Sequence, residues 1–258
     1  MTIPANAARN TFRRTALALA ALPLALGLAA CGKEETGPAS LSGDKIAPIA
    51  APAGKVWGDV VEKTADGGYR MGNPDAPIKI IEFASLTCSH CADFSGEASA
   101  ELRDTFVGSG RVSYELRNFV RDAIDITAAQ LTRCGTPESY FPLTEQVFAA
   151  QADIFAKVQG AGEAAYKAAM AQPDDKRGMA VAELAGLTEF FAARGISRDQ
   201  ASACLANTAD AAALAKMAND QGEKFDITGT PTFVLNGAKI DENSWKMLKA
   251  KLETLGAR

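Results

Sequence analysis

The sequence contains one histidine, His90, and one Cys-x-x-Cys pair in 258 residues. Hydrolases of the Ser–His–Asp type need a histidine that is free to act as a general base, and His90 instead lies between Cys88 and Cys91. A structural zinc ion needs four ligands, usually including a second cysteine pair or two histidines, and the sequence has neither. We therefore expect no histidine-based hydrolase, no structural zinc or other metal site, and no bound cofactor.

Basic residues are too few and too scattered for a nucleic-acid-binding surface. The chain has 27 Lys and Arg against 31 Asp and Glu, a formal net charge of −4, and no Lys/Arg-rich run. An acidic domain repels phosphate backbones, so we expect no nucleic-acid partner. The stretch Gly160-Ala161-Gly162-Glu163-Ala164-Ala165 matches a dinucleotide-binding pattern by letter, but it follows helix-like sequence rather than a strand. We therefore predict a loop there.

No apolar run in the N-terminal region reaches the ~20 residues that span a bilayer. The run over residues 15–30 follows three arginines and is interrupted by Pro23, a pattern typical of a signal peptide. Its end, Leu28-Ala29-Ala30-Cys31, resembles a bacterial lipobox, in which the cysteine is lipidated. We predict a signal peptide over residues 1–30 and a lipid anchor on Cys31, with an uncleaved anchor or a plain secreted form as the alternatives.

The composition divides the rest of the chain into a linker and a folded part with an insertion. Residues 31–55 are rich in Pro, Ala, Gly and Ser and predict a flexible tether. Residues 56–121 and 225–258 combine strand and helix patterns, whereas residues 122–224 are alanine-rich and carry only helical periodicity. The sequence thus predicts an α/β fold interrupted by an all-helical insertion.

Local patterns also predict the individual elements. The apolar run 78–84 predicts a buried strand, followed by a helix from near Ala92 and a strand over 112–119, which together make a βαβ unit. Asn236-Gly237 predicts a hairpin between strands 232–235 and 239–240. Two more strands are predicted over 56–61 and 69–71. A last helix is predicted over 243–255, with Asn243 as its N-cap and Gly256 ending it. The inserted helices are predicted over 126–134, 141–155, 162–171, 179–194 and 198–221, and Ser197 is the predicted N-cap of the last one.

The Cys88–Cys91 pair follows the first buried strand, where the chain enters a helix. The free N–H groups and the positive dipole end of a helix favour a thiolate over a thiol. We predict that Cys88 is an exposed thiolate with a low pKa, that Cys91 is a more buried resolving thiol, and that His90 stabilises the Cys88 thiolate. For His90 the alternative is a solvated residue at the helix end.

Two motifs together resemble the DsbA-like family of thioredoxin-fold proteins. They are residues 82–91, Glu-Phe-Ala-Ser-Leu-Thr-Cys-Ser-His-Cys, and residues 228–232, Thr-Gly-Thr-Pro-Thr. The resemblance covers residues 59–255 and implies an α/β, thioredoxin-like fold with an inserted all-helical domain. It also implies disulfide exchange in the bacterial envelope, with the first cysteine reactive and the second resolving. Ser89 departs from the proline often found there, so the direction of electron transfer stays open.

The same resemblance implies roles for three residues outside the cysteine pair. Pro231 matches the family's cis-proline, beside which the Thr230 backbone pairs with an extended substrate peptide; the alternative is a trans proline that starts a strand. Glu82 matches a buried acid. Burial in an apolar strand raises the pKa of a glutamate, which suits Glu82 to relay protons to or from Cys91. A surface glutamate at a sheet edge is the alternative.

The cysteine count suggests a second, structural disulfide. A lipid on Cys31 leaves four of the five cysteines, and one adjacent pair with one distant pair is the simplest partition. We predict a bond between Cys134 and Cys204, both in the insertion, which stabilises the fold outside the cytoplasm. Two buried free thiols or a regulatory redox pair are the alternatives.

These observations predict a monomeric, lipid-anchored thiol–disulfide oxidoreductase on the periplasmic side of the envelope, with the outer membrane favoured over the inner. Its expected partners are reduced exported proteins and, by the resemblance, a quinone-linked membrane protein that reoxidises it. An isomerase or reductase of the same fold is the nearest alternative. A copper-handling lipoprotein that uses the Cys88–Cys91 pair as metal ligands is the more distant one.

Overall fold

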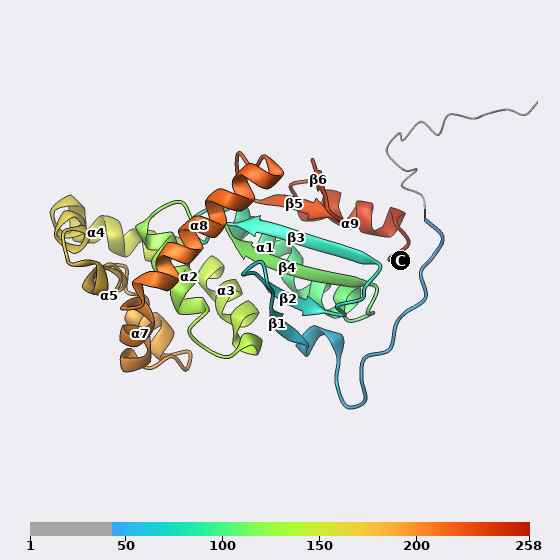
Figure 1. Cartoon of the computed structure of the whole chain (residues 1–258), viewed down its shortest axis with the longest axis horizontal. Helices are drawn as coiled ribbons and strands as arrows, with labels where there is room; N and C mark the ends of the chain where they lie inside the picture. Colours follow the sequence, from blue (N-terminus) through green and yellow to red (C-terminus); the bar gives the residue numbers. More distant parts are fainter. Residues whose placement is uncertain (1–42) are drawn as a thin grey trace, which may run out of the picture. The chain divides into compact units, whose positions relative to one another are not determined.

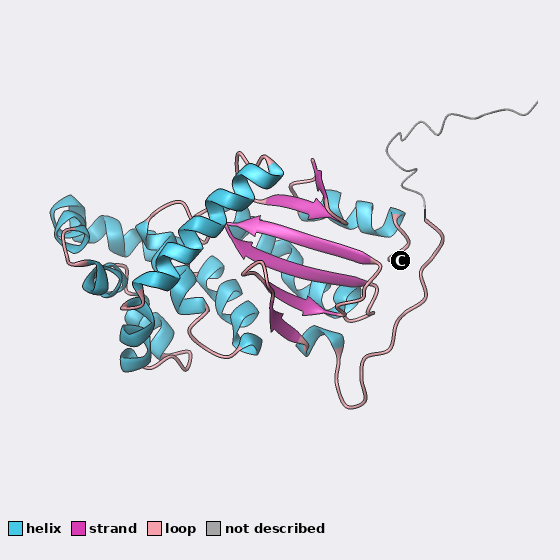
Figure 2. Cartoon of the chain, in the orientation of Figure 1, coloured by secondary structure: helices cyan, strands magenta, loops and turns pink. Residues whose placement is uncertain are grey.

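The computed structural model describes residues 43–258, and the strands of this part form one six-stranded sheet (Figures 1 and 2). The strand order is β1-β2-β4-β3-β5-β6; β3 and β4 are parallel, and all other neighbours are antiparallel. The strands are β1 (Val61–Lys63), β2 (Tyr69–Gly72), β3 (Ile78–Ala84), β4 (Val112–Asn118), β5 (Thr232–Leu235) and β6 (Ala238–Ile240).

The predicted βαβ unit is confirmed and lies at the centre of the sheet. β3 pairs with β4 in parallel over its whole length, and helix α1 (Ser89–Glu101) connects them. The helix continues as a π-helical turn, Leu102–Val107, and ends before Gly108. All seven residues of β4 are buried, as expected for a parallel strand covered on both faces.

The chain between β4 and β5 contains helices joined by loops and no strand, so the predicted α/β fold with a helical insertion is confirmed. Most of these helices gather at one end of the sheet, while α8 runs past the ends of β3 and β4 and α1 lies behind the sheet (Figure 1). The inserted helices are α2 (Ala123–Thr132), α3 (Tyr140–Ala149), α4 (Gln151–Met170), α5 (Asp174–Leu184), α6 (Leu187–Ala192), α7 (Arg198–Leu205) and α8 (Thr208–Phe225), with a 3-10 turn at Pro137–Ser139.

The insertion corrects four sequence-based predictions. The predicted helices over 141–155 and 179–194 each span two helices, with breaks at Ala150 and at Ala185-Gly186, where Gly186 has φ of 69°. The stretch 160–165, predicted as a loop, lies inside α4, because alanines with high helix propensity surround a single break at Gly162 (φ 81°). The predicted helix over 198–221 is two helices, since the Asn207 side chain accepts from Asp210 N and starts α8 anew. Ser197 caps α7 by accepting from Gln200 N, as predicted.

The N-terminal part of the described chain also differs from prediction. Residues 56–61 are not a strand: Trp57–Asp59 form a 3-10 turn, and β1 begins at Val61. The turn forms because the indole of Trp57 is buried and its Nε1 donates to Ile49 O at 2.8 Å. Within the predicted tether, the backbone N–H groups of Gly43, Ile46 and Ile49 donate to Thr254, Gly256 and Ser109, contacts that composition cannot reveal. These residues lie against the folded part.

The C-terminal part follows the predicted order. Asn236 and Gly237 both have positive φ, 48° and 87°, and join β5 to β6 in a two-residue hairpin. The last helix, α9, spans Trp245–Thr254, so the prediction of Asn243 as its cap was wrong: Ser244 is the N-cap and makes no side-chain capping bond. Gly256 follows the helix with φ of 102°, as predicted.

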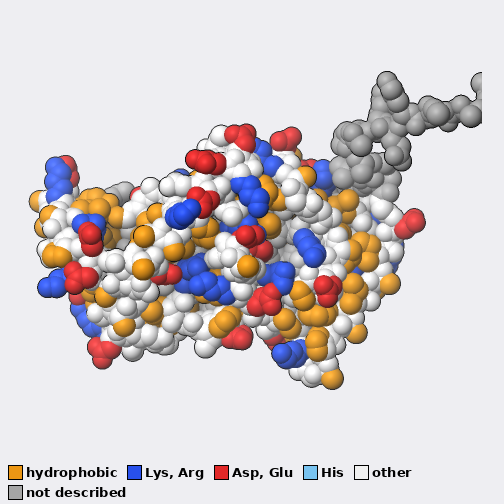
Figure 3. Space-filling model, viewed as in Figure 1, with side chains coloured by type: hydrophobic (Ala, Val, Ile, Leu, Met, Phe, Trp, Pro, Cys, Tyr) orange, Lys and Arg blue, Asp and Glu red, His pale blue; other side chains and the backbone are white. Residues whose placement is uncertain are grey.

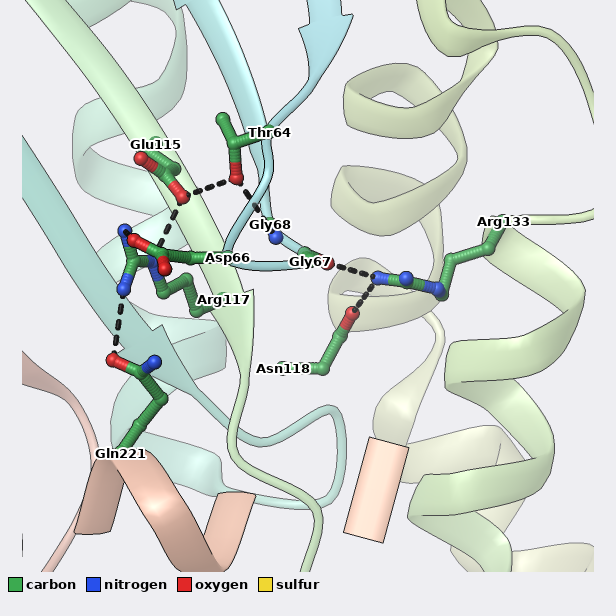
Figure 4. Close-up of polar contacts among 9 residues, drawn as sticks. All are labelled: Thr64, Asp66, Gly67, Gly68, Glu115, Arg117, Asn118, Arg133 and Gln221. Carbon is green, nitrogen blue, oxygen red and sulfur yellow. Dashed lines mark hydrogen bonds and ion pairs between the residues drawn. The ribbon is translucent and has the colours of Figure 1, made fainter. Parts of the chain in front are cut away.

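A polar cluster joins the β1–β2 turn, β4 and α8 (Figure 4). Arg117 is buried and donates to Glu115, Asp66 and Gln221 at 2.7, 2.8 and 2.8 Å. Its guanidinium thus finds acceptors from three separate elements, which compensates part of the cost of burying the charge.

The surface over this region carries both signs of charge. On the face seen in Figure 3, Lys and Arg side chains are interspersed with Asp and Glu. Within residues 43–258, no helix is both long enough and apolar enough to cross a membrane.

Candidate active site

The cysteine pair lies at the N-terminus of α1, where β3 ends. Cys88 is the N-cap residue, in extended conformation, and α1 begins at Ser89 rather than near Ala92 as predicted. The prediction was three residues late because the first turn exposes Ser89 and His90, so the apolar period starts only at the buried Cys91. Cys88 therefore lies within reach of the free N–H groups of the first helical turn.

The contacts of Cys88 favour its thiolate. Cys88 and Cys91 are both free thiols, and burial alone would raise their pKa values. The hydrogen bond from the Cys91 thiol, then a hydrogen bond to Thr230, then the N–H groups of Cys91 and His90 outweigh that effect and lower the pKa of Cys88 to about 4. Deprotonation near neutral pH is therefore essentially complete at Cys88.

The two contacts to Thr230 serve different protonation states. In the thiol form, Cys88 Sγ donates to the Thr230 carbonyl oxygen at 3.2 Å. The Thr230 hydroxyl is buried and has no other partner among the described residues, so it can donate to the sulfur once the proton has left. Thr230 can thus hydrogen-bond to Cys88 both as a thiol, through its carbonyl oxygen, and as a thiolate, through its hydroxyl.

Cys91 has the opposite environment. It is 0% exposed, against 6% for Cys88. The prediction of an exposed Cys88 was therefore wrong, because its sulfur faces the Thr230 carbonyl rather than solvent. Its hydrogen bond to Cys88, burial, and the negative charge of Glu82 all raise the pKa of the Cys91 thiol. Cys88 therefore ionises first, while Cys91 stays protonated and its S–H group donates a hydrogen bond to the Cys88 sulfur.

Glu82 is buried in β3 at 1% exposure, which excludes the surface alternative. Burial raises the pKa of its carboxyl to about 8, against a smaller opposing effect of the hydrogen bond from Tyr114. The charge of Cys88 also raises the pKa of Glu82, and the charge of Glu82 raises the pKa of Cys91. At neutral pH the carboxyl of Glu82 is therefore mainly protonated while Cys88 is a thiolate.

Within the described residues, the imidazole of His90 makes no hydrogen bond to either sulfur. Its side chain is 81% exposed and lies 3.8 Å from Asp93 Oδ2. The backbone N–H of His90, rather than the ring, helps to lower the pKa of Cys88. An effect of the imidazole itself therefore stays a prediction.

A groove of about 390 Å³ runs beside the cysteine pair. The Thr230–Pro231 peptide bond at its wall is cis, and Pro231 directly precedes β5. This position next to Cys88 follows from the antiparallel pairing of β5 with β3. The remaining lining residues come from the starts of α1 and α9: His90, Asp93, Phe94, Glu97, Asn243 and Ser244.

The turn between β3 and Cys88 is held by residues that the sequence reasoning did not single out. They are polar and bonded to Ser85, Leu86, Thr87 or Cys88; Asp125 and Gln151 are buried, whereas Arg121 and Asp122 are exposed. They come from the entry to the insertion and from the start of α4: Arg121, Asp122, Asp125 and Gln151. No local pattern could have found Gln151, since its partners lie 63 and 65 residues away.

The remaining predicted residues lie elsewhere. Cys134 and Cys204 are joined by a disulfide with a Cα–Cα distance of 6.0 Å, which ties the end of α2 to α7. Cys31 lies outside the described residues. Among residues 43–258, no three His, Cys, Asp or Glu side chains gather closely enough to hold a metal ion.

Comparisons with known proteins agree on the family. The sequence profile of the family described as thioredoxin matches residues 64–254. A crystal structure described as protein-disulfide isomerase from Novosphingobium aromaticivorans is 32% identical, with a TM-score of 0.69, and the alignment covers 74% of this chain and 97% of that one. The crystal structure of Wolbachia pipientis alpha-DsbA1 shares the fold at 22% identity, with a TM-score of 0.58 over 73% of this chain and 90% of that one.

Curated relatives are longer than the matched region. A Rickettsia conorii protein whose name assigns it as a protein-disulfide oxidoreductase is 25% identical over 185 residues, or 72% of this chain. The chain spans only 59% of the length of that relative.

Proposed function

The chain belongs to the DsbA-like family of thioredoxin-fold disulfide oxidoreductases, and we propose that its Cys88–Cys91 pair introduces disulfides into exported proteins. The observation that carries this proposal is the difference between the two sulfurs. Cys88 is held as a thiolate at a helix N-terminus, while Cys91 is buried behind it as a thiol. One reactive and one resolving thiol are what disulfide exchange needs.

The first step starts from the oxidised enzyme. A substrate thiolate attacks Cys88 Sγ, the Cys88–Cys91 bond breaks, and a mixed disulfide between substrate and Cys88 forms. The electron pair of the broken bond goes to Cys91, which takes up a proton. Because Glu82 has a carboxyl pKa of about 8 and interacts with the charge on Cys91, it is the candidate donor of that proton.

The second step releases the product. A second thiolate of the substrate attacks the substrate sulfur of the mixed disulfide, and Cys88 leaves as a thiolate. The substrate has then lost two electrons and two protons and gained one disulfide, while the enzyme is left reduced. A thiolate with a pKa of about 4 is a good leaving group, so this step favours release.

The direction we propose is oxidation. Stabilising the Cys88 thiolate stabilises the reduced enzyme, which makes its disulfide a stronger oxidant. The contacts of Cys88 with Cys91, Thr230 and the helix N–H groups all act in this sense. The residue between the cysteines also affects the reduction potential of the Cys88–Cys91 pair, and this chain has Ser89 where the family often has proline. The size of the potential is therefore a quantity to measure.

Equilibration of the protein with glutathione buffers tests this direction. We expect an oxidising Cys88–Cys91 pair and rapid oxidation of a dithiol peptide by the oxidised protein, with no reaction by Cys88→Ala. The Cys91→Ala variant should not oxidise the peptide either, because it cannot form the Cys88–Cys91 disulfide. Its Cys88 thiolate should instead attack the oxidised glutathione of the buffer, release one glutathione thiolate and keep the other glutathione as a stable mixed disulfide. A reducing, thioredoxin-like potential together with insulin reduction would instead support a reductase or isomerase. The name of the Novosphingobium relative favours that second function.

We propose the periplasmic side of the envelope as the location, with a lipid on Cys31 as the anchor and a quinone-linked membrane protein as the oxidant. Exported proteins that need disulfides are the matching substrates. Metabolic labelling with a fatty acid, lost in Cys31→Ala, tests the anchor.

The copper-handling alternative makes a different prediction. The protein would then bind Cu(I) tightly, Cys88→Ala and Cys91→Ala would abolish this binding, and no peptide oxidation would be seen.

A further inference from the structure

Two side chains of the helical insertion hold Leu86, which lies two residues before the reactive cysteine. Asp125 Oδ1 accepts from the Leu86 N–H at 2.8 Å, and Gln151 Nε2 donates to the Leu86 carbonyl oxygen at 2.9 Å. Gln151 also donates to the carbonyl oxygen of Cys88 at 3.1 Å. Both polar groups of one turn residue, and one of Cys88 itself, are therefore fixed from outside the βαβ unit.

Asp125 extends this hold to the rest of the turn. It is 0% exposed, and its Oδ2 accepts from Ser85 Oγ at 2.5 Å and from Arg121 N at 3.0 Å. Thr87 Oγ1 donates to Asp122 Oδ2 at 2.8 Å. Each residue from Ser85 to Cys88 thus bonds to the insertion or its entry. Burial raises the pKa of the Asp125 carboxyl to about 7, because it outweighs the opposing effect of these hydrogen bonds.

The carbonyl oxygen of Cys88, which Gln151 contacts, also takes part in the hydrogen bonding that starts α1. Cys88 O accepts the N–H of Ala92 at 3.1 Å, the bond that starts α1, while Cys88 Sγ faces the Thr230 carbonyl at 3.2 Å. A rotation of the Cys88 backbone would move the sulfur away from Thr230 and from the N–H groups of the first turn. A second bond on the same oxygen restricts that rotation.

We propose that Gln151, together with Asp125, is a positioning residue of the reactive pair, by which the helical insertion holds Cys88 in the geometry that stabilises its thiolate. Neither side chain touches a sulfur, so the effect acts through the backbone of residues 85–88. The inference rests on the proposed disulfide chemistry, which it extends from the cysteine pair to the insertion. In this view the insertion tunes the oxidising strength of the enzyme.

Gln130 provides a matched control. It is buried to a similar degree as Gln151, at 3% and 8% exposure, and its Nε2 also donates to two backbone carbonyls. Those carbonyls belong to Cys204 and Asn207, at the junction of α7 and α8. Gln130→Leu therefore removes the same kind of interaction from the same insertion without reaching the turn at Cys88.

The test compares Gln151→Leu with Gln130→Leu in the full chain by two readouts, the ultraviolet absorbance of the thiolate during acid titration and equilibration with glutathione. Both variants should lose thermal stability. In Gln151→Leu the midpoint of thiolate titration should rise by about one pH unit, and the enzyme should become about tenfold less oxidising, because the two quantities are linked. Gln130→Leu should shift the titration midpoint by less than about 0.3 pH unit and the equilibrium constant with glutathione by less than about twofold.

Asp125→Asn is a second test that keeps the shape of the side chain. It should move both readouts in the same direction as Gln151→Leu. An unchanged titration midpoint and glutathione equilibrium in every folded Gln151 or Asp125 variant would overturn the inference. Equal shifts in Gln130→Leu would also overturn it, since they would reflect general loosening of the insertion. Failure of the proposed function is a separate result: the unaltered protein would then not oxidise a dithiol peptide.

Discussion

The hydroxyl of Tyr114 donates a hydrogen bond to the carboxyl of Glu82, and both side chains are buried in neighbouring strands of the sheet that carries the cysteine pair. No Lys, Arg or His of residues 43–258 forms an ion pair with Glu82, so no cation compensates its charge. It therefore titrates as a group that prefers to remain protonated in the folded state.

The first prediction concerns stability against pH. The pKa of Glu82 is about 8 when folded and 4.5 in the unfolded reference, so the folded state binds the extra proton between these values. The contribution of Glu82 to stability is complete below pH 4.5 and is lost as the pH rises through 8. Glu82→Gln should remove this loss, so that urea unfolding at pH 8 to 9 finds the variant more stable relative to the unaltered protein than at pH 5, by roughly 3 kcal/mol.

Activity should change in the opposite sense. If Glu82 supplies the proton for Cys91, Glu82→Gln slows peptide oxidation about 10–100-fold, a loss typical of a removed proton donor. The titration of Cys88 should stay close to that of the unaltered protein. A variant that oxidises the peptide at the full rate would show that Cys91 takes its proton from solvent instead.

A second prediction compares the oxidised and reduced proteins. The pKa of Cys88 is lowered from 9.0 to about 4, so the unfolded reduced chain binds more protons between these values. The stability of the reduced form therefore rises with pH from 4 to 9, and this contribution is lost as the pH falls through 4. The oxidised form has no such thiol. Unfolding both forms across this range should show a stability difference that moves toward the reduced form as the pH rises, whereas parallel curves would contradict the low pKa.

A third prediction concerns the disulfide of the insertion. The Cys134–Cys204 bond closes a loop of 70 residues, and its removal in Cys134→Ala/Cys204→Ala should cost about 4 kcal/mol of stability. Peptide oxidation at a temperature where the variant is folded should be unchanged, because neither sulfur contacts the reactive pair. A large loss of activity in the folded variant would point to a redox role for this bond.

A fourth prediction concerns the polar cluster of Figure 4. Arg117→Met would leave the Glu115 carboxylate buried without its cation and should cost about 3–5 kcal/mol. Replacing both residues by Met should cost less than the single change. Asp66→Asn is the contrast, since Asp66 is 52% exposed and its bridge to Arg117 should contribute below about 1 kcal/mol. Equal losses for Arg117→Met and Asp66→Asn would contradict the assigned importance of burial.

The sequence predicted best where a signal is local. The apolar run 78–84 and the Asn236-Gly237 turn each determine their structure within a few residues, and both were predicted with the right bounds or nearly so. The Trp57 region failed because its conformation depends on a bond to Ile49 O that no alternation pattern encodes. The start of α1 was misplaced because its first turn faces solvent.

The candidate site shows the same division. Cys88 and Cys91 are adjacent in sequence and were readily found, while Glu82, Thr230 and Pro231 came from resemblance. Gln151 and Asp125 came from neither, because a buried amide or carboxylate has meaning only once its distant partners are known. Long-range polar contacts are therefore the part of this site that sequence reasoning alone misses.

The meeting of Cys88 with Thr230 has a consequence for the order of events during synthesis. The two residues are 142 positions apart, and both Cys134 and Cys204 lie between them. Every other cysteine of the described chain has thus left the ribosome before Thr230 does. A nascent chain carries thiols that still lack the Thr230 contact, and the pair acquires its complete environment only as the last ninth of the protein is made. Cys88 therefore gains the Thr230 contact that lowers its pKa only after Cys134 and Cys204 have been made.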